Sequence, residues 1–447
     1  MSPSKRSWWA YSPRTFTAKV IALGAFLTFL LTVYIFIPSS SYRLKTGLFN
    51  PRTRSSCSPE AYSNGQWTWS PKTNVTAMTN ARQAMDMAGF EGCAADREFF
   101  WHLGSDHEEM WGRFPNVTNY EWTPSRQCNN LRPLNRELLV QDMVEQGGWL
   151  LIGDSVTENH FFSLSCILYP HVRATPNYTE NPYFERHWPQ NLYLREDSPL
   201  IPSLNFPVGF NLSVTPLVTF RRVDLLLSGE QLEQLHRETY HDKDDFQLFS
   251  KELYWSMAPS EYLEIFQKPL PEANYGTLIV STAGHWTTTL MSGFRDESKE
   301  NDGYGIDNVL KFFRVAMKKW ADDIQAAMDV DEGTKGGRRR QVVVRAYLPG
   351  HENCHNLFEP YKKPVGWQIK WYNWPWILDF DRIFGEVVSS SKYRDIHYLG
   401  IERPALLRPD AHAAGDCLHI MTGAGVLEGW SHYIWHYITR EIPGRIR

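Results

Sequence analysis

The sequence predicts a layered α/β fold with a mainly parallel central sheet, because strand-like and helix-like segments alternate along the chain. Residues 149–152 are a continuous apolar run, Trp-Leu-Leu-Ile, and residues 156–162 contain no Gly or Pro and can continue as a helix. Apolar residues recur at helical spacing over 308–328, and 341–348 is apolar and β-branched. The 447-residue length allows one large domain with a smaller lobe, or two to three average domains.

The N-terminal part predicts a membrane anchor. Residues 20–38 are uncharged and span about 28 Å as a helix, enough to cross the hydrocarbon core of a bilayer. The segment begins late for a cleavable signal peptide and lacks a small-residue cleavage site, so we favour a signal anchor. Residues 1–19 are then a cytoplasmic tail, and residues 39–56, rich in Ser, Arg and Pro, are a stem. Basic residues flank both sides, so charge does not decide the orientation.

Sequons and cysteines indicate that the body lies in an oxidising lumen. All six cysteines follow the apolar segment, an even number that disulfides accommodate. Four Asn-x-Ser/Thr patterns also follow it, with the acceptors Asn74, Asn116, Asn177 and Asn211. We therefore expect a single-pass type II membrane protein.

Residues 57–148 are expected to form a cysteine-bearing N-terminal lobe, and 149–447 the catalytic domain. The cysteines of the lobe are spaced too widely for a zinc site. Residues 138–146 predict a helix that ends at a Gly-Gly pair, and the alternating segment 210–220 predicts a strand. Residues 278–286 read as a strand that ends in a turn of small residues, and 331–340 as a loop.

A candidate nucleophile follows the first predicted strand. Gly153, Asp154 and Ser155 stand where this strand would turn into a helix. Such a turn lifts a serine hydroxyl above the sheet edge, beside backbone N–H groups that have no partner within the helix. This arrangement suits a nucleophile next to an oxyanion hole, although the same tripeptide also occurs as an ordinary helix cap.

A candidate base lies near the C-terminus. Asp416 precedes His419 by three residues, so both side chains face the same side of a turn or helix start. An aspartate placed there can hold the imidazole tautomer while the other ring nitrogen accepts a proton from a serine.

Other features restrict the function. A net charge of −4 argues against nucleic-acid binding, and no Gly-rich phosphate loop indicates a nucleotide cofactor. The 18 tryptophans suit stacking on sugar rings, although most are expected in the core. His351, Cys354 and His355 resemble a metal cluster, but a disulfide at Cys354 is the preferred interpretation and no metal site is expected.

Four motifs in order resemble those of the trichome-birefringence-like (PC-esterase) family of the SGNH/GDSL superfamily. The resemblance covers roughly residues 57–440, and its motifs are Tyr120–Leu134 with Cys128 and Asn129, Gly153–Asn159 with Ser163–Cys166, Gly284–Trp286, and Asp416–His419 with the tail Gly423–Tyr437. One departure is that the family usually has Asn where this chain has Thr282.

The resemblance implies an SGNH-like three-layer sandwich and a Golgi polysaccharide O-acetyltransferase. Ser155 would be the nucleophile, His419 the base and Asp416 the orienting residue. The backbone N–H of Ser155 would be one oxyanion donor, with Gly284 or Thr282 near the other. Further residues are expected at the oxyanion hole or the pocket: Gly153, Asp154, Asn159, His285 and Trp286. His285 is also the alternative base.

The resemblance further implies three disulfides: Cys57–Cys128, Cys93–Cys166 and Cys354–Cys417. It implies an acetyl donor, acetyl-CoA or another carrier, as co-substrate without a bound cofactor, and a polysaccharide or glycan as acceptor. Two alternatives stay open. A carbohydrate O-acetylesterase would use the same three residues with water as acceptor, and a non-catalytic glycan-binding Golgi protein would not use them.

Overall fold

The computed structural model describes residues 57–177, 188–241, 246–332, 339–368, 373–413 and 415–442. The predicted cytoplasmic tail, membrane anchor and stem lie outside these residues. Within them, no helix is both long and apolar enough to cross a bilayer.

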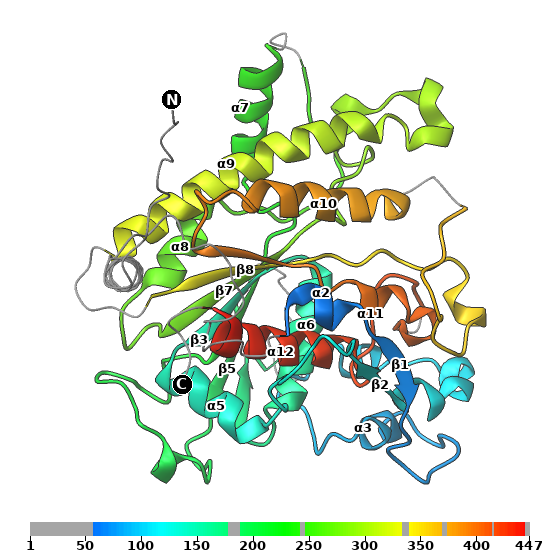
Figure 1. Ribbon diagram of the computed structural model, residues 1–447, viewed down its shortest axis with the longest axis vertical. Helices are drawn as coiled ribbons and strands as arrows, with labels where there is room; N and C mark the ends of the chain where they lie inside the picture. The colour runs from blue at the N-terminus through cyan, green and yellow to red at the C-terminus, as the bar shows by residue number, and fades with distance from the viewer. Residues whose placement is uncertain are drawn as a thin grey trace, which may run out of the picture. The chain divides into compact units, whose positions relative to one another are not determined.

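The predicted mainly parallel sheet is confirmed (Figure 1). In the described part of the chain, seven strands form one sheet, and five neighbours, β6-β3-β7-β8-β9, pair in parallel. The other two, β4 and β5, complete one edge in antiparallel pairing. In spatial order the strands are β4 (Val172–Thr175), β5 (Gln190–Leu194), β6 (Val218–Arg222), β3 (Gly148–Gly153), β7 (Tyr275–Ser281), β8 (Gln341–Arg345) and β9 (Ile396–Leu399).

Most predicted elements form with boundaries shifted by a few residues, but the strand predicted at 210–220 is confirmed only from Val218 onward. Its first half is a turn, in which the N–H groups of Val214 and Thr215 donate to the carbonyl of Asn211. Pro216 has no N–H to donate to a ladder, so the strand begins only at Val218. The alternation of apolar and polar residues there reflects partial burial of a turn.

Helices cover both faces of the sheet (Figure 1). One face carries α5 (Arg136–Glu145), α6 (Ser155–Ile167) and α12 (Val426–His436). The other carries α7 (Gly229–Tyr240), α8 (Pro259–Gln267), α9 (Ile306–Glu332) and α10 (Ile377–Val388). The long amphipathic α9 contains the predicted helix 308–328 and buries its apolar residues against the sheet side.

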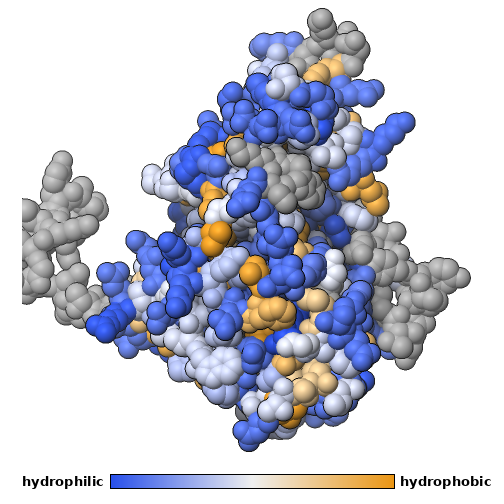
Figure 2. Space-filling model, turned by 90° about the vertical axis from the view of Figure 1, so that its right-hand side faces the viewer, coloured by the Kyte–Doolittle hydropathy of each residue, from blue (hydrophilic) through white to orange (hydrophobic). Residues whose placement is uncertain are grey.

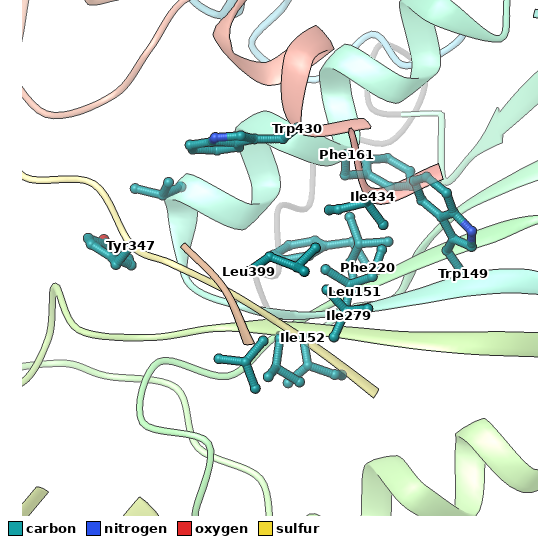
Figure 3. Packing of buried hydrophobic residues seen from close by; sticks show 14 of the residues in the cluster. Trp149, Leu151, Ile152, Phe161, Phe220, Ile279, Tyr347, Leu399, Trp430 and Ile434 are labelled. Atoms are coloured by element: carbon teal, nitrogen blue, oxygen red, sulfur yellow. The ribbon is translucent and has the colours of Figure 1, made fainter. Parts of the chain in front are cut away.

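The core beneath α6 fixes the helix that begins at Ser155. Figure 3 shows Phe161 of α6 and Ile434 of α12 close to the strand residues Leu151 and Phe220, with Trp430 of α12 to their left. All five side chains are almost fully buried, and each such burial stabilises the fold by about 1.5–3 kcal/mol. Polar bonds join the two helices as well: His160 Nε2 lies 2.9 Å from Ser431 Oγ. Helix α6 is therefore anchored along its length, and its first residue is held in place.

The N-terminal segment packs with the sheet domain, since Ser55–Arg447 form one compact unit. It contains α2 (Pro59–Ser63), α3 (Gln83–Ala88) and α4 (Phe99–His102), and the antiparallel pair β1 (Gln66–Trp69) and β2 (Tyr120–Thr123). A short helix, α11 (Arg403–Leu406), follows β9.

The three expected disulfides are confirmed: Cys57–Cys128, Cys93–Cys166 and Cys354–Cys417. The second joins the N-terminal segment to the end of α6, and the third holds the segment that contains Asp416 and His419. The four sequon asparagines are all exposed, so their side chains are accessible to a glycosyltransferase; glycosylation itself stays a prediction.

The carboxyl ends of the parallel strands point to the right in Figure 1, and Figure 2 views that end of the molecule. Hydrophilic residues predominate on its described surface, with a small group of hydrophobic residues in the lower half (Figure 2). In open α/β sheets, ligands bind outside the carboxyl ends of the strands, so this end is where a site is expected.

Candidate active site

A chain of two hydrogen bonds joins the three residues that the sequence predicts as a catalytic group. His419 Nε2 lies 2.7 Å from Ser155 Oγ, and His419 Nδ1 lies 2.7 Å from Asp416 Oδ2. Because a carboxylate only accepts, Nδ1 carries the proton of the neutral ring and Nε2 accepts the Ser155 O–H. The imidazole is thus in the tautomer that can take a proton from the serine.

The turn at the end of β3 determines where Ser155 sits. Asp154 is the N-cap of α6, and its Oδ1 accepts the Val156 N–H at 3.0 Å. A Cβ on Gly153 would lie 2.3 Å from Thr157 Oγ1, so a side chain has no room there. Ser155 is the first helical residue, and its N–H has no partner within the helix and can donate to an oxyanion.

The Asp416–His419 segment is a tight turn, not a helix start. Asp416 Oδ1 accepts the N–H groups of Leu418 and His419, both at 2.8 Å, in the manner of an Asx turn. Burial alone would raise the pKa of Asp416, but the hydrogen bonds from His419 and from the backbone outweigh it, and the pKa lies below its usual value. The Asp416 carboxylate is therefore ionised near neutral pH and can accept the His419 Nδ1 proton in a hydrogen bond.

Tyr347, just past β8, is a site residue that the sequence reasoning missed. Its hydroxyl donates to Asp154 Oδ2 at 2.7 Å, and both side chains are buried. The same hydroxyl lies 2.3 Å from where a Cβ of Gly284 would stand. Tyr347 therefore contacts both segments that are expected to frame the oxyanion hole. Its place at the carboxyl end of a parallel strand is the signal that points to it.

A pocket of about 580 Å³ opens beside Ser155 and His419. The other lining residues are Glu98, Trp101, Glu158, Arg222 and Trp255. Trp101 stands edge-on to His419, with ring centroids 5.1 Å apart, and half-buried indoles of this kind can stack on sugar rings. Glu158 is paired with Arg97 at 2.6 Å, and both side chains are buried. The pocket thus combines aromatic walls with charged groups.

Three residues expected at the oxyanion hole or pocket are engaged elsewhere. The Thr282 hydroxyl donates to the carbonyl of Asp224 at 2.7 Å and accepts the Trp286 indole N–H at 3.1 Å, so it has no proton for an oxyanion. Trp286 is fully buried and packs edge-on against Phe313 at 4.8 Å. These two side chains stabilise the core below the site, and the expectation that they line it is wrong.

Asn159 is likewise a core residue. It is fully buried one turn along α6 from Ser155, and its Nδ2 lies 3.0 Å from His102 Nδ1. His102 stacks on Phe162, with ring centroids 4.2 Å apart. Since Trp101 precedes His102 on α4, Asn159 supports the pocket wall from behind.

His285 is not joined to Ser155, unlike His419. Its Nε2 lies 3.8 Å from Asp224 Oδ1, and 22% of its side chain is exposed. Burial raises the pKa of Asp224. In the geometry described, the histidine that contacts Ser155 is His419.

A group of possible metal ligands lies next to the Asp416–His419 turn, but it cannot act as a metal site. Cys354, His355 and Cys417 bring ligand atoms within 4.8 Å of one another. The two sulfurs are bonded to each other in a disulfide, so neither is a thiolate. This agrees with the structural role that we expected for Cys354.

The protein thus has an α/β fold with a mainly parallel sheet, and a chain of two hydrogen bonds joins a serine, a histidine and an aspartate. Comparison with protein-family models gives no match, and a search of curated proteins gives no match either. A family and an activity can therefore only be proposed, from the motifs and the geometry.

Proposed function

We propose that this protein is an O-acetyltransferase that moves an acetyl group to a hydroxyl of a polysaccharide or glycan through an acetyl-Ser155 intermediate. The observation that carries the proposal is the chain Ser155–His419–Asp416, with both hydrogen bonds at 2.7 Å beside a pocket with aromatic walls. The motif resemblance to the trichome-birefringence-like family supports the acetyl group and the glycan acceptor.

In the first half-reaction, Ser155 Oγ attacks the acetyl carbonyl of the donor while its proton passes to His419 Nε2. The carbonyl oxygen becomes an oxyanion beside the Ser155 N–H, with Gly284 expected to offer the second backbone donor. His419 then protonates the leaving group, and Asp416 stabilises the imidazolium in the meantime.

In the second half-reaction, His419 takes the proton of a sugar hydroxyl, whose oxygen attacks the acetyl-serine. Collapse of the tetrahedral intermediate releases the acetylated glycan and returns the proton to Ser155. Water in place of the sugar would make the protein an esterase, because the first half-reaction is the same.

The test is incubation of the purified full-length protein with acetyl-CoA, or with 4-nitrophenyl acetate as a simple donor, and a panel of glycans. Acetyl on a glycan that disappears with Ser155→Ala supports transfer, whereas free acetate alone assigns the esterase. Ser163→Ala is a matched control, because Ser163 lies on the same helix but does not line the pocket. Its hydroxyl donates to Glu428 Oε1 at 2.7 Å. Absence of both products contradicts the proposal.

We further propose that the protein is a single-pass type II protein of the Golgi membrane, with the sheet domain in the lumen. Three disulfides and four exposed sequon asparagines support this topology. In sealed microsomes the domain should resist protease until detergent is added, and N-glycosidase should increase its gel mobility. Digestion without detergent would contradict the topology.

A further inference from the structure

Arg222 is a pocket residue that the proposed acetyl transfer does not yet use. It ends strand β6, where its Cα pairs in register with that of Gly153 on β3. Two residues after Gly153 comes Ser155, and Arg222 and Ser155 line the same pocket. The guanidinium thus belongs to the wall next to the nucleophile.

Two neighbours hold the guanidinium in one orientation. Arg222 Nε donates to Asp224 Oδ1 at 3.0 Å, and Arg222 Cζ lies 4.2 Å from the centre of the Trp255 ring. Asp224 is itself fixed, because its Oδ2 accepts the Trp255 backbone N–H at 2.8 Å. The Arg222 side chain is 7% exposed and the Asp224 side chain is fully buried. The group is therefore preorganised.

The outer edge of this guanidinium, Nη1 and Nη2, has no hydrogen-bond partner in the described part of the chain. Among the residues that the structure describes, neither Nη1 nor Nη2 of Arg222 donates to an acceptor, and only Nε is used. Four N–H donors thus remain on a side chain that is more than nine-tenths buried and that lines the pocket. This edge is open to the pocket, and its two nitrogens match the two oxygens of a carboxylate or phosphate.

Among the charged residues that line the pocket, Arg222 is the one suited to bind an anion. Glu158 is neutralised by Arg97 at 2.6 Å, and its Oε1 also accepts from Gln190 at 2.6 Å. The exposed Glu98 suits sugar hydroxyls, which donate to carboxylates. An acid group together with hydroxyls is the chemistry of an acidic sugar, and a phosphate with a ribose is the chemistry of a nucleotide-bearing acetyl donor.

We propose that Arg222 binds an acid group, a carboxylate or a phosphate, on one of the two substrates of the acetyl transfer. This inference rests on the proposed function for the identity of the substrates, but not for the existence of the anion site. The carboxylate would come from a uronic acid of the acceptor glycan, and the phosphate from the acetyl donor.

Binding to the full-length Ser155→Ala protein tests the proposal without turnover. Isothermal titration would compare two matched pairs of probes. The first pair is an oligosaccharide of glucuronic acid against the glucose oligosaccharide of the same linkage and length. The second is acetyl-CoA against S-acetyl-pantetheine, which has no phosphate. One charged probe should bind more tightly than its neutral partner, and the pair that shows the preference identifies the source of the acid group.

Substitution of Arg222 should abolish that preference. Arg222→Gln should weaken the charged probe by about 10- to 100-fold, as for loss of a hydrogen bond to a charged group, and should change the neutral probe by less than about twofold. Arg222→Lys keeps the charge but loses the two-pronged geometry, so its affinity for the charged probe should lie between those of the wild-type protein and Arg222→Gln. Arg221→Gln is the matched control, because the neighbouring residue on β6 points to the opposite face of the sheet.

Thermal unfolding shows which variants are folded. If Arg222→Gln is not folded, the comparison is made with Arg222→Lys. Equal binding of charged and neutral probes in both pairs would overturn the proposal, as would a preference that survives replacement of Arg222. A protein that binds the charged probe through Arg222 but transfers no acetyl group keeps this inference while the proposed function fails.

Discussion

Replacing Tyr347 with Phe tests whether the Tyr347 hydroxyl holds the turn Gly153–Ser155, which carries the proposed nucleophile. The substitution removes one oxygen atom and, with it, the 2.7 Å hydrogen bond to Asp154 Oδ2. Asp154 Oδ1 keeps its bond to the Val156 N–H at 3.0 Å. The carboxylate remains fully buried, so one of its oxygens loses its partner with no access to water.

The magnitude follows from that geometry. A hydrogen bond to a charged group contributes about 1.5–3 kcal/mol, and a buried partner left behind brings the loss toward the upper value. If all of it appears in the barrier to acetylation of Ser155, the rate falls by roughly 10- to 100-fold. If it appears only in folding, the free energy of unfolding falls by the same amount and the rate stays unchanged.

Two measurements separate these outcomes. Urea denaturation gives the free energy of unfolding, and the burst of 4-nitrophenol from 4-nitrophenyl acetate gives the rate of acetylation. Tyr262→Phe is the matched control: its hydroxyl is equally buried and donates to the Leu226 carbonyl at 2.9 Å on the other face of the sheet. The control should lose stability and keep its burst rate. A folded Tyr347→Phe protein with the wild-type burst rate would refute the positioning role.

Three further predictions follow from the same site and core. Ser155→Ala and His419→Ala should each lower acetyl transfer by about three orders of magnitude or more, and Asp416→Asn somewhat less; normal transfer by any of them in a folded state would contradict the mechanism. Gly284→Ala places a Cβ 2.3 Å from the Tyr347 hydroxyl, so the acetylation burst should slow while Gly366→Ala, where a Cβ has open space, leaves it unchanged. In the folded protein, burial lowers the pKa of six described histidines: His160, His171, His351, His412, His432 and His436. The unfolded chain therefore binds protons below about pH 6.5 that the folded protein does not, and the free energy of unfolding in urea should fall from pH 7 to pH 5. Replacing one of these histidines by Gln should make the free energy of unfolding depend less steeply on pH. An unchanged pH dependence would argue that this histidine does not contribute.

The sequence predicted those parts of the fold that depend on local pattern. Apolar runs located β3, β7 and β8, and helical spacing located α9, because burial on both faces of a parallel sheet demands such runs. The segment 210–220 misled because a half-buried turn alternates like a strand. The disulfide pairs came from the motif resemblance, since six cysteines alone permit fifteen pairings.

Site residues that belong to a sequence motif were predictable. Residues that reach the site only through the arrangement of the strands were not. Ser155, Asp416 and His419 stood out by residue type and order. Tyr347 and Arg222 did not, because each reaches the site only through the position of its strand in the sheet. Three residues placed at the site only by the family resemblance were the weakest predictions: Thr282, Trp286 and Asn159 all bond within the core.

The measurement that tests the central claim most directly is mass spectrometry of the protein quenched shortly after exposure to an acetyl donor. The account predicts an acetyl group on the peptide that contains Ser155. It also predicts that the adduct is lost when an acceptor glycan is added before quenching and is absent from Ser155→Ala. Acetyl transfer to glycan by folded Ser155→Ala, with no adduct on that peptide in the wild-type protein, would contradict it.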